Sequence, residues 1–404
     1  MYYNLKKHKE FLYLDLIVYL IPISLIFGNL ILNSLCIVST IIYIALFYKK
    51  KINYTDYKSY FNLLYILLIF FIINLTLSSN FNLTIKSLFG FLKNYLLFLI
   101  ILFCLNEIDN FKKIFSKIIF FLIFFVIIDL LIQNFFLIDI FGNEINTSHG
   151  RRLAGPFGDE GVAGSFISKL IFLSFFYIID KKFINKFIFP IIILAIITTI
   201  LTNERSASIM LLSSSIIFFI FYKINFFYKI FSSSIIILAL IIMFNLNNNL
   251  KSHFIDVPAK AFKDNHHKAH FLTAYEIFKE NKFFGSGIKT FRTLCSDKKY
   301  EKINTKFVNN RCSTHPHNIY FEILAEAGIL GLLIIIGINL FILFFLIINF
   351  FKKNNYKNEI LLIFCCFYIL FWPLQTTGSF FSTWNGFFYF IFFSYFFNLK
   401  KLTI

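Results

Sequence analysis

The sequence predicts an all-α protein that crosses a lipid bilayer about twelve times and carries one large loop outside it. Two observations lead to this fold class. The 404 residues are 58% hydrophobic and include 61 Phe, and the apolar residues gather in long runs close to the roughly 20 residues that a transmembrane helix needs. Between two of these runs, residues 247–318 form a polar, lysine-rich stretch that is too long to be a simple connection.

The first apolar run, residues 12–47, is long enough for two helices that turn near Gly28. Further spans are predicted at 61–77, 87–105, 114–137, 163–179, 187–202, 207–222, 230–246, 319–348, 359–375 and 384–398. This pattern divides the chain into an N-terminal transmembrane bundle of about nine spans (1–246), a large periplasmic loop (247–318) and about three C-terminal transmembrane helices (319–404).

The lysines predict how these spans are oriented. Lys6, Lys7 and Lys9 precede the first run and no small-residue cleavage site follows it, so we expect an uncleaved first span. Lysines also follow every even-numbered span, and cytoplasmic loops are normally the basic ones. Both termini are therefore predicted to be cytoplasmic. The net charge of +18 comes without a basic tract interleaved with aromatic residues, which argues against a nucleic-acid partner.

All five arginines fall in loops on the opposite, outer side: Arg151, Arg152, Arg205, Arg292 and Arg311. Chance placement is the alternative explanation. An arginine side chain, however, is a planar and permanently charged fork that suits phosphate and carboxylate oxygens. The distribution therefore favours an anion-binding site on the outer side of the membrane.

Three ionisable residues are predicted inside spans, in the outer half of the membrane: Lys93, Lys169 and Asp129. A charge at this depth is costly unless it reaches the surface or a wet cavity. Snorkelling of the lysines to the outer headgroups and a polar cavity open to the outer side both fit this placement.

The junction between the polar stretch and the next span carries the most specific motif. His315 and His317 flank Pro316, a residue tolerated in the first turn of a helix. Both imidazoles are therefore expected at a helix entrance, where anions are favoured. His317-Asn318 is followed by nine residues, then Gly328, two residues and Gly331. This spacing resembles the signature of the O-antigen ligase and O-antigen polymerase family. The alternative is an ordinary membrane helix whose two glycines allow close helix packing.

Two outer loops resemble the same family. In the glycine-rich loop 151–166, the stretch from Arg152 to Gly155 is similar to the family's Arg and glycine-rich turn, although Asp159-Glu160 stand where many relatives have Pro-Asn. This acidic pair is a candidate base or a cap of the next helix, and we favour a capping or structural role for Asp159. In T-N-E-R-S-A, residues 202–207, Arg205 resembles the family's Ser-Arg or Glu-Arg turn, with a solvated turn residue as the alternative.

The polar stretch contains further candidates. Residues 270–287 predict an amphipathic helix on or near the membrane that stops at Gly285. Histidines 266, 267 and 270 are interpreted as a solvated cluster, because no carboxylate or cysteine follows at a metal-ligand spacing. Cys295 and Cys312 share this loop and would be able to pair in an oxidising periplasm, but chain order does not decide whether they are close enough.

The resemblance implies a metal-independent glycosyltransferase with a GT-C-like helical arrangement in the bacterial inner membrane, acting in polysaccharide and lipopolysaccharide biosynthesis at the cell envelope. Its donor would be a glycan on undecaprenyl diphosphate, and its acceptor a hydroxyl of lipid A core, or another lipid-linked glycan in a repeat-unit polymerase. Membrane lipids are the remaining expected partners and no cofactor is implied. A secondary transporter and an O-linked protein glycosyltransferase are further alternatives, although the paired repeats typical of transporters are not found.

By this resemblance the outer cations carry the chemistry. Arg152 and Arg205 would stabilise the diphosphate leaving group, and His317 would deprotonate the acceptor hydroxyl or hold the diphosphate. Asp159 and Glu160 are alternative candidates for the base. The residues expected to bind substrate are Arg151, Arg311, Lys169, Lys93 and Asn318.

The predicted orientation can be tested with reporter fusions. Because the lysine-rich loops mark the cytoplasmic side, fusions at Lys50, Asn110 and Phe227 should report the cytoplasm, and fusions at Asn80 and Asn265 the periplasm. An inverted result at Asn265 would remove the physical basis for an outer anion site.

Overall fold

The computed structural model describes residues 2–145, 152–179, 187–256, 265–353 and 355–403. Within these residues apolar helices occupy all twelve predicted positions: α1 (Tyr2–Phe27), α2 (Asn29–Tyr48), α3 (Tyr54–Thr76), α4 (Phe81–Glu107), α5 (Phe111–Phe136), α6 (Ala163–Ser174), α7 (Ile188–Leu201), α8 (Arg205–Phe221), α9 (Phe226–Leu246), α14 (Ile319–Phe351), α15 (Lys357–Phe371) and α16 (Thr383–Thr403). Six of them, α2, α3, α4, α5, α9 and α14, are long and apolar enough to cross a membrane. The all-α polytopic membrane fold is therefore confirmed.

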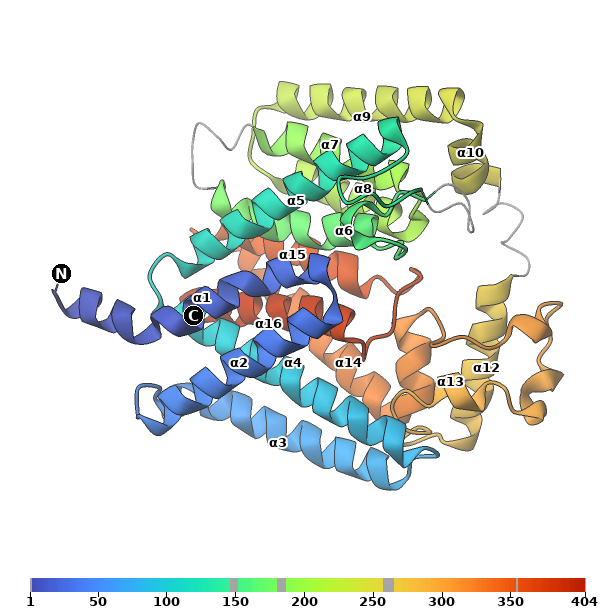
Figure 1. The fold of residues 1–404 in the computed structure, drawn as a ribbon, viewed down its shortest axis with the longest axis horizontal. Coiled ribbons are helices and arrows are strands. Elements are labelled where there is room, and N and C mark those ends of the chain that lie inside the picture. The colour runs from blue at the N-terminus through green and yellow to red at the C-terminus, as the bar shows by residue number, and fades with distance from the viewer. Residues whose placement is uncertain (1, 146–151, 180–186, 257–264, 354, 404) are drawn as a thin grey trace.

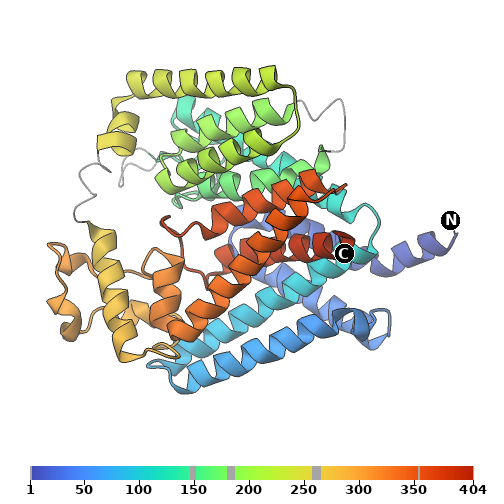
Figure 2. The ribbon, with the colours of Figure 1, turned by 180° about the vertical axis from the view of Figure 1, so that it is seen from behind.

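The large loop and the chain ends lie toward opposite ends of the helices. In both views, α12 (His266–Glu280) and α13 (Phe291–Leu294) gather at one end, whereas the N- and C-termini lie toward the other (Figures 1 and 2). This arrangement puts the loop residues together at a single face of the bundle.

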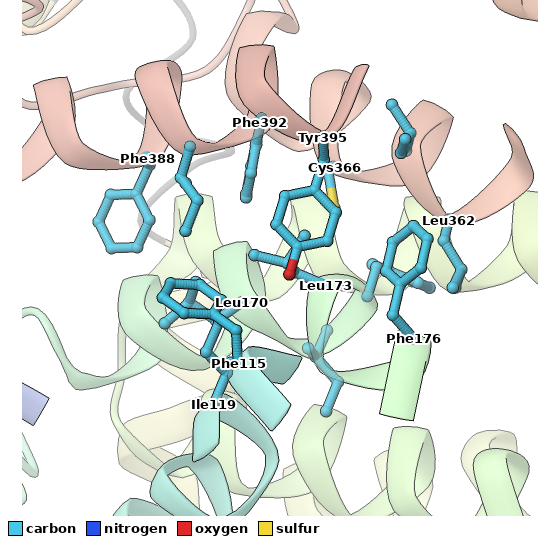
Figure 3. Close-up of a cluster of buried hydrophobic side chains, with 14 of the residues drawn as sticks. Phe115, Ile119, Leu170, Leu173, Phe176, Leu362, Cys366, Phe388, Phe392 and Tyr395 are labelled. Carbon is cyan, nitrogen blue, oxygen red and sulfur yellow. The ribbon is translucent and has the colours of Figure 1, made fainter. Parts of the chain in front are cut away.

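The core is dominated by aromatic and branched side chains from helices that are far apart in the sequence. Figure 3 shows Tyr395 of α16 reaching among Phe115 of α5 and Leu173 of α6. The buried Tyr395 hydroxyl lies 3.1 Å from the Ser116 hydroxyl, which satisfies the one polar group that the ring brings into the core. Lipid tails are as apolar as these side chains, so close packing and internal hydrogen bonds, rather than exclusion of water, hold such helices together.

α14 is broken close to its N-terminal end. Gly328 has φ 68° and ψ −169°, which is not helical, and a Cβ atom there would lie 2.3 Å from the carbonyl oxygen of Phe283. The residues after the break donate to the loop instead of to their own helix: the N–H of Ile329 donates to Lys282 O at 2.8 Å. Gly328 thus lets the large loop dock on the helix backbone, and it is not a site of helix-to-helix packing.

The amphipathic helix of the loop begins and ends earlier than the sequence predicts. Asn265 caps α12 by accepting from the N–H of Lys268 at 2.8 Å, and the helix ends at Glu280, so Gly285 is not its stop. Gly285 instead contacts the backbone of Glu326, where a Cβ atom would approach within 2.3 Å of the carbonyl carbon. α12 packs its apolar side against α14 of the same chain.

The two loop cysteines are bonded to each other. The Cα atoms of Cys295 and Cys312 lie 5.2 Å apart, a distance that a disulfide can bridge. The other cysteines, at positions 36, 104, 365 and 366, are buried and free. The bond encloses the segment between α13 and the turn that precedes α14.

We expect loss of this disulfide to destabilise the large loop. In the chain-entropy account, a bridge across 17 residues is worth about 3 kcal/mol, so Cys295→Ser should lower the thermal unfolding midpoint in detergent. Under denaturing, non-reducing conditions the native protein should expose only the four other thiols to alkylation. Labelling of all six cysteines would mean that the bond does not form.

Candidate functional site

A polar cavity of about 430 Å³ lies at the end of the bundle that carries the large loop. Its walls come from α6, α8, α12, α15, the start of α16, the loop between α15 and α16, the turn before α14 and the short helix that contains His253. The charged and imidazole side chains that line it are Arg152, Lys169, Glu204, Arg205, His253, His267, His315 and His317. Four residues that the sequence singled out, Arg152, Lys169, Arg205 and His317, are therefore brought together from separate segments.

The two arginines approach the cavity from different chain segments. Arg152 precedes the short helical turn η1 (Gly155–Phe157), and its guanidinium lies across Gly161, where an added Cβ atom would be 3.4 Å from Nη1. Its buried Nε has no hydrogen-bond partner among the described residues. Arg205 is the first residue of α8, and the two guanidinium groups are close enough to repel each other. Within the described part of the chain no ion pair neutralises either one, so both are available to an anion.

Lys169 supplies the third cation from the second turn of α6. Its Nζ donates to Asn385 Oδ1 at 2.8 Å and lies 4.8 Å from the ring centre of Phe388. The Asn385 amide in turn donates to Ser379 O at 2.9 Å. The ammonium group is therefore held on the cavity wall by α16, which favours the polar cavity over snorkelling.

Glu204 is the one carboxylate among the described lining residues. Its Oε1 accepts from the N–H of Gly164 at 2.6 Å and its Oε2 from the N–H of Ser165 at 3.0 Å. Burial raises the pKa of Glu204 to about 7, against the opposing effect of these hydrogen bonds and of the nearby Arg152 and Lys169. When it is ionised, this carboxylate beside Arg152 and Lys169 makes the cavity less positive than its cations alone would.

His317 lies just before α14 and is held there by hydrogen bonds. Its φ of 62° is left-handed, which is uncommon for a residue with a side chain, and its carbonyl accepts from the N–H of Thr377 at 2.8 Å. The ring nitrogen Nε2 lies 3.0 Å from the Ser313 hydroxyl. α14 begins at Ile319 after Asn318, so Pro316 precedes the helix and does not occupy its first turn as expected.

Histidines gather around this ring. The ring centres of His267, His270 and His315 lie 5.3, 5.2 and 4.2 Å from that of His317. Burial, followed by the neighbouring imidazoles, lowers the pKa of His317 to about 3, and burial lowers that of His270 to about 4. His317 is therefore a neutral imidazole at pH 7 in the free protein, able to accept a proton or a hydrogen bond. His267 and His270 therefore pack against His317 and are not solvated as expected, whereas His266 is exposed.

The histidine cluster is not arranged as a metal site. Among the described residues, no group of three or more His, Cys, Asp or Glu side chains is placed to hold a metal ion. Both ring nitrogens of His315 already have oxygen partners, the Thr314 hydroxyl at 2.9 Å and Thr377 O at 3.0 Å.

Two residues that the sequence analysis expected to bind substrate have other partners. Arg311 is buried outside the cavity lining, where it donates from Nε to Cys295 O at 2.9 Å and from Nη2 to Ser296 O at 3.2 Å. It thus fastens the disulfide-closed loop. Asn318 accepts from the N–H groups of Tyr320 and Phe321, at 3.0 and 3.3 Å, as the N-cap of α14. Its amide nitrogen donates to the carbonyls of the α15–α16 loop.

The remaining candidates lie away from the cavity or outside the described residues. Lys93 donates to the side chains of Asn33 and Thr383 and is not among the lining residues. Asp159 and Glu160 are exposed in the turn before α6. That helix is preceded by Val162, which supplies no side-chain cap, so the expected capping role of Asp159 is not observed. Arg151 falls outside the described residues.

Glu204 and the loop between α15 and α16 were not predicted as parts of the site. Glu204 directly precedes Arg205, and this adjacency was the only available signal. No feature of the sequence pointed to Thr377 or Asn385, because their roles depend on backbone and amide contacts with residues more than 50 positions away.

Comparison with known proteins supports the resemblance found in the sequence. Residues 190–336 match the family described as O-antigen ligase. The match covers just over a third of the chain, from α7 into α14, and includes Arg205 and His317 but not Arg152 or Lys169. No match is found among curated proteins.

We predict that His317 stays neutral well below pH 6. Its folded pKa of about 3 lies below the ordinary value near 6.5, so the imidazole gains a proton only in strong acid. The rate constant for diethyl pyrocarbonate modification of His317, followed by mass spectrometry, should stay flat from pH 7 to 5. A histidine peptide should lose more than about tenfold over the same range. A midpoint near 6.5 for His317 would contradict the buried, imidazole-lined setting.

Proposed function

We propose that this protein is an O-antigen ligase-like glycosyltransferase of the bacterial inner membrane, which moves a glycan from a lipid diphosphate carrier to an acceptor sugar hydroxyl on the periplasmic face. The observation that carries the proposal is that Arg152, Lys169, Arg205 and His317 line one polar cavity. Fixed cations beside a neutral imidazole suit a reaction in which a diphosphate leaves and a hydroxyl loses its proton. The family match over residues 190–336 supports the same chemistry.

The donor in this proposal is an oligosaccharide or polysaccharide linked to undecaprenyl diphosphate. The acceptor oxygen bonds to the anomeric carbon while the bond from that carbon to the phosphate oxygen breaks, and the electron pair of the broken bond remains on the diphosphate. Arg152 and Arg205 stabilise this growing charge because they are in place before the reaction starts. Lys169, fixed by Asn385, adds a third positive charge, so the cluster supplies the charge that a metal ion would otherwise provide.

His317 is the proposed proton acceptor. Its imidazole is neutral in the free protein, and the Ser313 hydroxyl and the fixed backbone orient the ring. A bound diphosphate brings negative charge near the ring, which raises its pKa and makes it a better base in the complex. The proton of the acceptor hydroxyl moves to the imidazole as the new glycosidic bond forms. Exposure of Asp159 and Glu160 outside the cavity favours His317 over either carboxylate.

The acceptor distinguishes two versions of the proposal. In a ligase it is a hydroxyl of lipid A core, and in a repeat-unit polymerase it is the glycan of another carrier-linked unit. Both versions use the same cations and the same base. Mass spectrometry of carrier-linked glycans in a deletion strain separates them, since a missing ligase leaves long chains on the carrier and a missing polymerase leaves single repeats.

We predict that Arg152→Ala or Arg205→Ala lowers the rate of transfer by about 10² to 10³, because each removes a charge contact that strengthens in the transition state. Lysine at either position should restore only part of the rate, since it keeps the charge but loses the two-pronged fork. The measurement is transfer from a purified polyprenyl-diphosphate donor in matched detergent. Arg292→Ala, which removes an exposed loop arginine outside the cavity, is the matched control and should stay near wild type.

His317→Ala should be as damaging as the arginine variants, because no other group in the proposal accepts the proton. EDTA should have little effect if arginines do the work of a metal. Near wild-type turnover for His317→Ala, or loss of transfer in EDTA, would overturn this mechanism.

A further inference from the structure

We propose that Glu204 is a positioning residue that sets the register between the cations of α6 and α8, and thereby builds the anion site. The inference rests on the proposed function for its catalytic consequence, but the anion site itself can be tested without any glycosyl transfer. When ionised, the Glu204 carboxylate would ordinarily repel the diphosphate that the cavity is proposed to hold.

Glu204 takes the place of a missing helix cap. The first N–H groups of a helix need acceptors, and Val162, the residue that precedes α6, has no side chain able to provide one. Glu204 reaches across from the turn between α7 and α8 and accepts from the N–H groups of both Gly164 and Ser165, at 2.6 and 3.0 Å. Because one carboxylate accepts both hydrogen bonds, its position and its orientation relative to α6 are fixed.

The start of α6 and the turn between α7 and α8 are closely packed. A Cβ atom on Gly164 would lie 2.6 Å from the Thr202 hydroxyl and 3.1 Å from Glu204 Oε1. The start of α6 therefore sits directly on the turn between α7 and α8. A shift of either segment would break the carboxylate contact or force this glycine against the turn.

This junction joins the elements that carry two of the cations. Arg205 follows Glu204 directly, and Lys169 lies just over one turn along α6 from Ser165. Lys169 is anchored on its far side by Asn385 of α16, so the Glu204 contact completes a chain of fixed links from α8 through α6 to α16. In this arrangement Glu204 acts through the placement of Arg205 and Lys169 and does not itself touch the substrate.

The direction in which the affinity for an anion changes when Glu204 is replaced distinguishes a positioning role from a purely electrostatic one. If Glu204 acts only as a negative charge beside the arginines, its removal should tighten anion binding. If it acts by placing the cations, its removal should weaken anion binding even though the cavity becomes more positive. A residue that only stabilises the fold should lower the melting temperature and leave the affinity of the folded protein unweakened.

The test uses Glu204→Gln in the full-length protein in detergent micelles, with inorganic pyrophosphate as the probe and calorimetry as the readout. We expect the Kd to rise by about tenfold, the loss of one well-placed charge-assisted contact, with the protein still folded by its melting curve. Glu204→Asp, which keeps the charge but shortens the reach by one methylene, should also weaken binding. Glu144→Gln is the matched control, since it removes the same charge from an exposed position outside the cavity lining and should leave the Kd unchanged.

Tighter or unchanged pyrophosphate binding in folded Glu204→Gln would overturn the inference, and so would a wild-type protein that binds no pyrophosphate. Transfer measured on the same samples should fall by about tenfold to a hundredfold, since displaced cations no longer meet the leaving group. If pyrophosphate binding responds as expected but the wild type transfers no glycan, the proposed function fails and the positioning role stands. Normal transfer and normal binding in Glu204→Gln would reject the positioning role alone.

Discussion

The end of this protein that carries the large loop is held together by the hydrogen bonds of two buried carboxylates one turn apart on α14. Glu322 accepts from the Ser379 hydroxyl and from the N–H of Phe380 at 2.7 Å, which fixes the loop between α15 and α16. Glu326 accepts from the N–H groups of Lys289 and Phe291, at 2.6 and 3.1 Å, which fixes the large loop. Buried carboxylates are costly unless they are fully bonded. The loops that supply these partners are therefore strongly tied to the helix.

The position of the proposed base depends on this anchoring. The loop that Glu322 holds also accepts from His315 through Thr377 O and donates from the N–H of Thr377 to the carbonyl of His317. The break at Gly328 lets the loop that Glu326 holds pack against the same helix. The imidazole is thus placed by contacts with segments on both sides of it in the sequence.

The cavity contains two kinds of group, positively charged side chains and histidines whose pKa values are lowered. Its arginines and lysine lack carboxylate ion pairs within the described residues, whereas burial, with smaller effects of neighbouring arginines and imidazoles, lowers the pKa values of its histidines. An anion entering this site meets two arginines and a lysine, and a hydroxyl entering it meets the neutral imidazole of His317. Glu204 moderates the positive charge and, in our proposal, sets the spacing of the cations. In the proposed reaction, one small site thereby binds the leaving group and accepts a proton without the two functions competing for the same residue.

The sequence by itself determined the helices, because apolar run length is set by the bilayer and needs no knowledge of partners. It also indicated His317, Arg152 and Arg205, whose motifs are local. Only the tertiary structure decided which cations share the cavity: Lys169 lines it and Arg311 does not, although both looked equally suitable in the sequence. Glu204 could not be assigned for the same reason, since its partners lie about 40 residues away and across a helix boundary. Local hydrophobicity fixes where the chain enters a membrane, whereas a polar group's role depends on which distant donors and acceptors the packed helices bring to it.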